Sequence, residues 1–251
     1  MILIIVFILH WYLVMFFHTF FLHRYAAHHH WSMSKRTENT IHFLSWIVSG
    51  SCYLSPYAYG ILHRLHHAYT DTEKDPHSPH YDKSPVHMLW RTRQIYFGIF
   101  KGTIEVEEKY KVGIPRWAAL EEFGHSFFVR ALWILLYIAF YSAFATQWWM
   151  WLLLPATILM GPLHGAIINY YSHKVGYRNY QLKKDTSTNL MPFDLFFFGE
   201  VFHNNHHKAP SRPNLGFRKW EFDPLWPIVV TMEFFRIIKI NRVDTPVPAM
   251  D

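Results

Sequence analysis

The sequence has a single cysteine, Cys52, among its 251 residues. One thiol excludes an internal disulfide, an all-cysteine zinc site and an iron–sulfur cluster held by this chain. A Gly-x-Gly-x-x-Gly nucleotide fingerprint is also missing. Any metal must therefore rely on histidine nitrogen, with carboxylate or amide oxygen as further donors, a set that suits iron, zinc, copper or nickel.

Charge is absent from two long stretches. Residues 1–22 contain no Lys, Arg, Asp or Glu, and neither do the 43 residues of 131–173. Crossing a bilayer takes about 20 apolar residues in a helix, so the second stretch has room for two helices. We expect three spanning helices, over residues 2–22, 129–146 and 149–171.

The details of these stretches support that interpretation. Trp148, Trp149 and Trp151 lie where the tip of a helical hairpin would meet the membrane interface. Pro155 and the pair Gly161-Pro162 are tolerated better in membrane helices than in soluble ones. The first stretch has neither a positive leading region nor a small-residue cleavage site, so we expect it to be retained as a helix rather than removed as a signal peptide.

The basic residues predict the orientation. All Lys and Arg except Arg130 fall in segments 23–125 and 174–251, which the positive-inside rule places in the cytoplasm. This bias also accounts for the net charge of +6 without a nucleic-acid partner. The apolar segment 40–61 separates two histidine motifs that we expect on one face, so it should enter and leave the membrane on the same side or lie buried. The N-terminus is then expected outside and the C-terminus inside.

We therefore expect an all-α integral membrane protein forming a single domain over 1–251. It should have about three spanning helices, a buried or re-entrant segment, and a cytoplasmic helical cap made of 23–126 and 172–251. Within the cap we expect a loop around Asp75–Pro79 and a surface helix over Lys101–Arg116. Segment 224–240 should form an amphipathic helix at the interface.

Histidine is abundant, with 19 residues, and it recurs in patterns. His-x-x-His-His occurs at 63–67 and again at 203–207, His23 and His28 follow the first predicted span, and Asn169 and His173 end the third at i, i+4. For one histidine, a hydrogen-bonded residue on a half-buried helix would explain the position equally well. The recurrence beside membrane elements favours metal binding, and nine histidines favour two metals: His23, His28, His63, His66, His67, His173, His203, His206 and His207.

His23 and His28 lie about 140° apart on a regular helix, so they do not share one face. If both bind the same metal, the helix should end or distort within residues 24–27. We expect His29 and His30 to be solvated or to support the ligands from behind. The other histidines receive no metal role: His42, His77, His80, His87 and His125, with His164 a possible lining of a substrate channel.

Taken in order, these motifs resemble those of the integral-membrane acyl-CoA desaturases. The resemblance includes His23-Arg24-x3-His28, the two five-residue boxes, Asp75-Pro76-His77 and Gly199-Glu200 before the third box, and it covers about residues 10–240. It implies that the nine histidines hold two iron ions and that Asn169 contacts one of them through water. Two features depart from the family pattern: only 22 residues precede the first box, and the haem-binding His-Pro-Gly-Gly element of a fused cytochrome b5 is absent.

The resemblance implies an activity: O2-dependent insertion of a cis double bond, at Δ9 of stearoyl- or palmitoyl-CoA, on the cytoplasmic side of a bacterial inner membrane. The electrons should come from a separate ferredoxin, cytochrome b5 or rubredoxin-like protein. Candidates to orient the metal-binding rings are Asp71, Glu73, Asp75 and Glu200. Candidates for an anionic headgroup are Arg64, Lys74, Arg178 and Lys183, although the positive-inside bias alone also accounts for these cations.

Two other functions fit the same residues. A di-iron hydroxylase or decarboxylase acting on acyl or alkyl chains would use a similar scaffold. A histidine-rich metal transporter would carry its ligands within the spans, near the middle of the membrane. Nearly all the patterned histidines lie beyond the ends of the predicted spans, which favours an enzyme.

Overall fold

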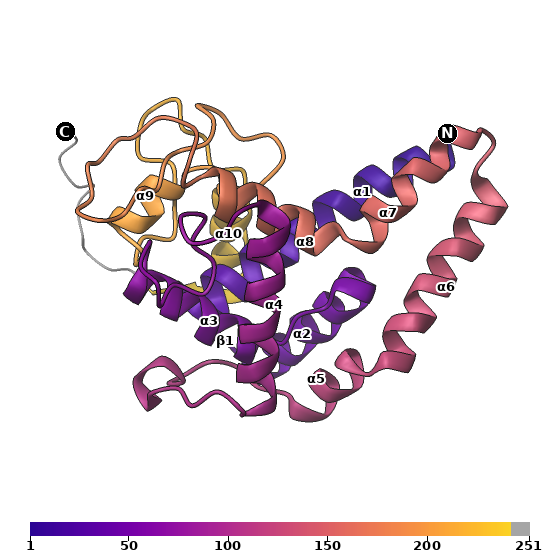
Figure 1. Ribbon diagram of the computed structural model, residues 1–251, viewed down its shortest axis with the longest axis horizontal. Helices are drawn as coiled ribbons and strands as arrows, with labels where there is room; N and C mark the ends of the chain where they lie inside the picture. Colours follow the sequence, from indigo (N-terminus) through magenta and orange to yellow (C-terminus); the bar gives the residue numbers. More distant parts are fainter. Residues whose placement is uncertain (242–251) are drawn as a thin grey trace.

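The computed structural model describes residues 1–241 and is almost entirely helical (Figure 1). Residues 242–251, the end of the predicted cap, lie outside the described residues. The elements are α1 (Ile2–Phe17), η1 (His18–Ala27), β1 (Trp31–Met33), α2 (Lys35–Ser49), η2 (Gly50–Cys52), α3 (Pro56–Tyr69), α4 (Pro85–Lys101), η3 (Glu108–Tyr110), α5 (Ala118–His125), α6 (Phe127–Phe144), η4 (Trp148–Leu152), α7 (Leu153–Ile158), α8 (Met160–Gly165), η5 (Ala166–Tyr171), α9 (His203–Lys208), α10 (Leu225–Phe234) and β2 (Ile238–Ile240).

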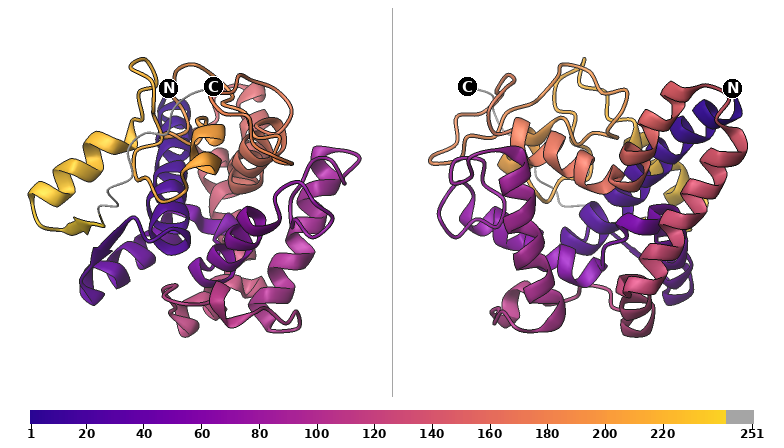
Figure 2. Two further views of the ribbon diagram at one scale, coloured as in Figure 1. Left: turned by 90° about the vertical axis from the view of Figure 1, so that its left-hand side faces the viewer. Right: turned by 45° about the vertical axis from the view of Figure 1, so that its right-hand side comes forward.

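Two helices are long and apolar enough to cross a membrane. The first joins α1 to η1 over Ile2–Ala27, five residues beyond the predicted end, and the second is α6. Both project away from α9 toward one end of the molecule, where the N-terminus lies beside the turn between α6 and α7 (Figures 1 and 2). Large apolar side chains are exposed along α6 and along the first half of α1, as a lipid-facing surface requires, whereas the second half of the first helix is mostly buried.

The third predicted span is bent rather than straight. Trp148–Ile158 and Met160–Tyr171 meet at an angle of 73°. Pro162 explains the break, because its ring excludes the helical hydrogen bond to the carbonyl of Ile158 four residues earlier. The sequence interpretation placed Gly161-Pro162 inside one continuous helix, and this was wrong in geometry. The structure thus has two candidate spans, or three if the bent pair counts as one.

The ambiguous segment 40–61 does not cross beside the first helix. Near the start of α2, Glu38 accepts a hydrogen bond from Tyr25, and near its end the carbonyl of Val48 accepts one from His10. The helix α2 therefore runs back toward the start of α1. Along α3 the direction reverses, because Tyr59 contacts His18 and His63 contacts His28. The segment enters and returns at the same end of the first helix, which agrees with the topological prediction.

Two predicted elements in the cap differ from the structure. The surface helix over Lys101–Arg116 was wrong: α4 ends at Lys101, because Gly102 adopts a left-handed φ of 70° and terminates it. Ser84 caps α4 at its start, with Pro85 in the first turn. The predicted helix over 224–240 is also too long, since α10 ends at Phe234 and β2 pairs antiparallel with β1.

Three buried clusters join the membrane elements to the cap. One packs η1 against α10 and the β1–β2 pair, the second packs α3 against α4, and the third joins Met15 and Ile168 to the loop before α9. This packing brings the ends of η1, α3, η5 and α9 to a common place, although these elements are far apart in the sequence.

Candidate metal centre

Two groups of four histidines converge at the junction of the membrane helices and the cap. The first group consists of His23, His28, His63 and His206, and the second of His66, His173, His203 and His207. Within each group the ligand nitrogens all lie within 4.8 Å of one another. The remaining predicted ligand, His67, contacts the first group, with its Nε2 3.0 Å from that of His63 and 2.9 Å from that of His206. All nine predicted histidines are therefore assembled, as five and four.

The π-helical turns of η1 explain how His23 and His28 join one group. The amide of His28 donates to the carbonyl of His23 at 3.2 Å, a bond that spans five residues instead of four. In a π-helix, residues five apart lie nearly above one another, and such turns concentrate at functional sites. The predicted distortion is therefore present, but it begins at His18, earlier than residues 24–27.

Carboxylates behind the rings fix their orientation. Three rings donate their Nδ1–H group to a carboxylate: His23 to Glu200 at 2.7 Å, His66 to Asp75 at 2.9 Å, and His173 to Asp71 at 3.0 Å. These three carboxylates were predicted, whereas Glu73 is exposed. A fourth, Asp185, accepts from His207 at 2.8 Å and was missed, because it precedes His207 by 22 residues and only folding brings the two together.

The ring pairs show that the site fits metal ions. In the neutral tautomer that donates Nδ1–H to a carboxylate, His66 and His207 each have a lone pair on Nε2, and these two nitrogens lie 3.2 Å apart. Two facing lone pairs repel unless a cation lies between them. With metal–nitrogen bonds of about 2.1 Å, ligands at right angles are about 3.0 Å apart and tetrahedral ones about 3.4 Å. The contacts of 2.9–3.2 Å fit ligands at right angles better than a tetrahedral zinc site.

The electrostatics of the site keep most rings neutral. Burial, with help from neighbouring rings, holds the pKa well below the usual range for six of them: His28, His63, His67, His203, His206 and His207. His66 differs, since burial lowers its pKa but the charge of Asp75 more than reverses the effect. Burial alone would raise the pKa of the Glu200 carboxyl, but the neighbouring His23 and Arg24 lower it to about 2. Ionised carboxylates thus surround imidazoles whose lone pairs are free for a metal.

A buried ion pair holds the Glu200 loop in place. The guanidinium of Arg24 is fully buried and donates to Asp223 at 2.7 Å and to the carbonyl of Phe198 at 2.6 Å. Gly199 fits beside this pair with φ of 94°, and a Cβ there would overlap both charged groups. This close approach requires glycine. Asp223 was not predicted, and nothing in its sequence context marks it.

The remaining candidates have structural roles or lie apart. Arg64 donates to the carbonyls of Ala27 and Val112, and Arg178 to those of Thr186 and Ser187, so both hold backbone rather than a headgroup. Lys74 and Lys183 are exposed. Asn169 is half-buried in η5, one turn before His173.

The histidines without an assigned metal role are also placed. His29 and His30 contact the carbonyls of Val112 and Pro210. Others pair with tyrosine, threonine or aspartate side chains: His42 with Tyr53, His125 with Tyr96, His80 with Thr186 and His87 with Asp82. His77 is the surprise, because it is buried against His66 and forms a further group with His66 and Asp75. His164 is buried against Trp11, with both ring nitrogens unpartnered among residues 1–241.

The fold and the site together define a membrane protein with two adjacent histidine groups at the cap end of its helices, each with the donor set of a metal site. Sequence comparison then gives the family: residues 2–230 match the model of the fatty acid desaturase family, and the chain belongs to that family. Delta-9 acyl-lipid desaturase 2 of Arabidopsis thaliana is 30% identical over 228 residues, covering 90% of this chain and 69% of the relative.

Other relatives agree. Delta-9 desaturase-like 5 protein of Arabidopsis thaliana is 29% identical over 227 residues, which cover 86% of this chain and 68% of the relative. The sn-1 stearoyl-lipid 9-desaturase of Anabaena variabilis is 26% identical, with 84% and 73% covered. The protein is therefore an oxidoreductase that desaturates fatty acyl chains, as the motifs predicted.

Proposed function

We propose that the protein inserts a cis double bond at Δ9 of a stearoyl or palmitoyl chain, with O2 as co-substrate and two iron ions held by the nine histidines. The observation that carries the proposal is the division of these histidines into groups of five and four, each with converging nitrogens. Several relatives with Δ9 names support the position of the double bond.

The metal pair supplies the oxidant that breaks unactivated C–H bonds, which no side chain can do. The chain loses two hydrogens, and two further electrons complete the reduction of O2 to two waters. Within the protein, Asp71, Asp75, Asp185 and Glu200 hold the rings in one tautomer. Asn169 is proposed to contact the four-histidine site through water, because it lies one turn from His173.

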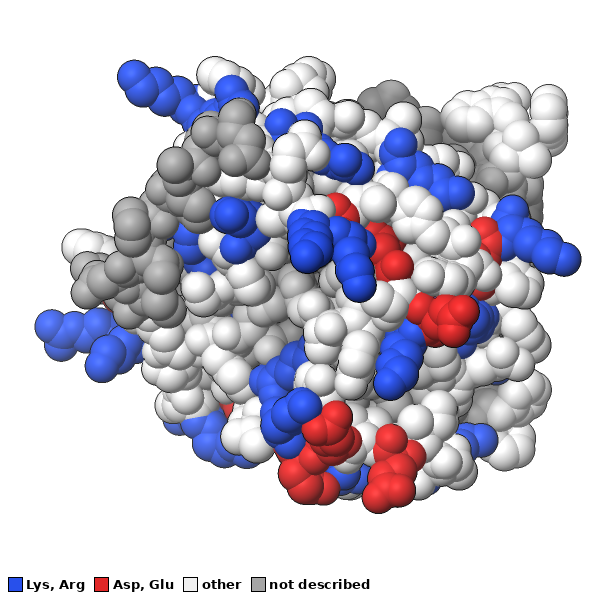
Figure 3. Space-filling model, turned by 60° about the vertical axis from the view of Figure 1, so that its left-hand side comes forward, with Lys and Arg blue, Asp and Glu red and all other residues white. Residues whose placement is uncertain are grey.

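We further propose that the cap faces the cytoplasm of a bacterial cell and that the acyl chain arrives as its CoA thioester. Lys and Arg are spread over the face of the cap in Figure 3, and Asp and Glu are fewer there. The cations suit an anionic headgroup, and they also suit the positive-inside rule. Some relatives are named for acyl-lipid substrates and others for acyl-CoA, so the headgroup is part of the test.

Electrons are proposed to come from a separate ferredoxin, cytochrome b5 or rubredoxin-like protein that docks on the cap. The sequence has neither a nucleotide fingerprint nor the cysteines for a cluster. The electron would have a short path from such a donor to the histidine groups at His207, because its hydrogen-bond partner Asp185 is only half-buried in the cap.

The test is expression in a host that lacks unsaturated fatty acids, with gas chromatography of the products. We expect monounsaturated acids with the double bond at Δ9, and none from His66→Ala, which should insert into the membrane normally. Purified protein should contain about two irons per chain. Hydroxylated or shortened products would favour the hydroxylase or decarboxylase instead, and one tightly bound zinc would refute the iron pair. Feeding acyl-CoA or acyl-lipid to membranes then distinguishes the headgroups.

A further inference from the structure

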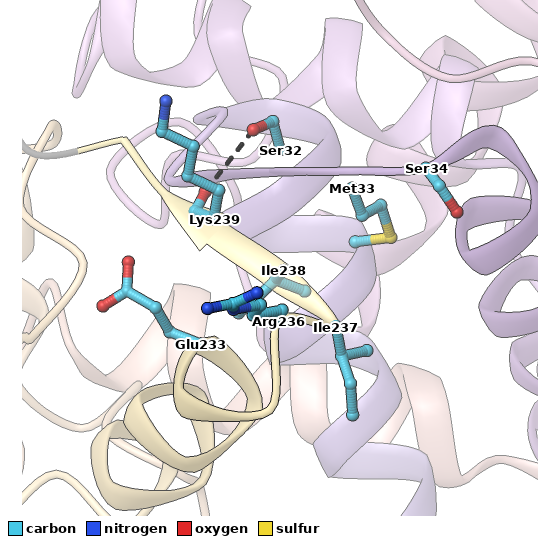
Figure 4. Close-up of a pocket in the computed structure, with 8 residues that line it drawn as sticks. All are labelled: Ser32, Met33, Ser34, Glu233, Arg236, Ile237, Ile238 and Lys239. Atoms are coloured by element: carbon cyan, nitrogen blue, oxygen red, sulfur yellow. Dashed lines mark hydrogen bonds between the residues drawn. The ribbon is translucent and has the colours of Figure 1, made fainter.

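An open groove of about 440 Å³ lies between the β1–β2 pair and the end of α10 (Figure 4). Ser32, Met33 and Ser34 form one wall, and Arg236 through Lys239 form the other, with Glu233 at the end of α10. None of these residues belongs to the metal centre. The desaturase activity does not account for this groove.

One wall of the groove follows the first candidate spanning helix closely in the chain. That helix ends at Ala27, and β1 starts four residues later. Directly before Arg236 in the chain, the end of α10 exposes bulky apolar side chains, with Phe234 79% and Phe235 65% exposed. An apolar surface with cations directly above it is the arrangement of a membrane interface.

Positive charge is concentrated at the groove. Arg236 and Lys239 are both exposed, and neither has an ion-pair partner within the described part of the chain. The nearby carboxylate of Glu233 accepts the backbone N–H of Ile240 and thereby holds β2. Ser34, which caps the start of α2, lies at one side of the groove.

The backbone at Arg236 supplies independent support. Its φ is 58°, in the left-handed region, where it terminates α10 through a hydrogen bond to the carbonyl of Glu233 at 2.9 Å. Glycine or asparagine usually occupies this position. A bulky cation there is strained, and such strain is found where the side chain has a function.

We propose that this groove binds the headgroup of an anionic phospholipid, with the phosphodiester held by Arg236 and Lys239. The acyl chains of that lipid would lie on the apolar surface at Phe234 and Phe235. The proposal depends on the membrane location of the protein and is independent of its substrate. Bound lipid would anchor the β1–β2 pair, which follows His28 and His30 directly.

The test uses the full chain, delipidated in detergent and titrated with dioleoylphosphatidylglycerol or dioleoylphosphatidylcholine while native mass spectrometry counts bound lipid. A cation near anionic lipid contributes about fivefold in affinity, so two predict about 25-fold preference for phosphatidylglycerol. Arg236→Gln with Lys239→Gln should abolish this preference, and Arg236→Lys should retain it.

The matched control removes two exposed cations elsewhere, Lys83→Gln with Lys219→Gln, and should bind like the wild type. Equal affinity of the wild type for both lipids would refute the proposal. So would equal losses in the control and groove variants, or displacement of the lipid by millimolar inorganic phosphate, which would indicate a site for the free anion.

Discussion

The carboxylate that the sequence did not reveal provides the sharpest test of the metal centre. Asp185 accepts the Nδ1–H of His207 at 2.8 Å, and its other oxygen accepts the backbone N–H of Ser187. Asp185→Asn keeps a hydrogen-bond acceptor of the same shape but removes the charge. His207 then becomes a weaker ligand, because its partner no longer raises its basicity.

The size of the effect follows from the position of Asp185. Removing a carboxylate behind a metal-binding histidine lowers metal affinity about 10- to 100-fold, which is about 1.4 to 2.8 kcal/mol. His207 belongs to the four-histidine group, so the loss should fall on that metal. The other metal keeps five histidines and should be retained.

The assay is metal content per chain by plasma mass spectrometry after dialysis against increasing EDTA. The wild type should lose both metals at similar chelator concentrations, whereas Asp185→Asn should pass through a plateau near one. His87→Gln is the matched control, because it changes a histidine–carboxylate pair, His87 with Asp82 at 2.8 Å, outside both groups, and it should behave as the wild type. Loss of both metals in parallel from Asp185→Asn would refute two separable sites.

Two further predictions concern the scaffold. Gly199→Ala should lower the melting temperature and the yield much more than Gly102→Ala does. Both glycines have a positive φ, but of the two only Gly199 lacks space for a Cβ. Equal losses in the two variants would contradict the role of the Arg24 contact. Burial lowers the pKa of His42 to about 4, so its folded form resists protonation. Its stabilising effect is complete above pH 6.5 and is lost as pH falls toward 4, by up to about 1.4 kcal/mol per pH unit. Thermal unfolding between pH 7 and 5 should show this slope, and His42→Gln should flatten it; an unchanged slope would show that other groups cause it.

Several features of this protein could be predicted from the sequence, because they depend on local composition or spacing. Two stretches without charge predict membrane helices, since burying charge in lipid is costly wherever the chain folds. The recurring boxes at 63–67 and 203–207 predict six of the nine candidate metal histidines, because their spacing places those six on common helical faces. Even the return of segment 40–61 followed from requiring the motifs to share one side.

Other features depend on contacts between distant segments. The division of the histidines into five and four depends on how η1, α3, η5 and α9 pack together, and no local pattern contains this information. The same holds for the partnership of Asp185 with His207 and for the burial of His77 against His66. The helix expected over 101–116 failed because Gly102 ends α4, and the one expected over 224–240 was shortened by a strand partner at β1.

The sequence by itself therefore determined the apolar segments and the candidate ligand residues, because hydrophobicity and ligand chemistry belong to individual side chains. Only the tertiary structure decided which rings share a site, which carboxylates support them, and where a cationic groove forms beside β1 and α10. Distances between side chains far apart in the sequence arise only when the helices pack.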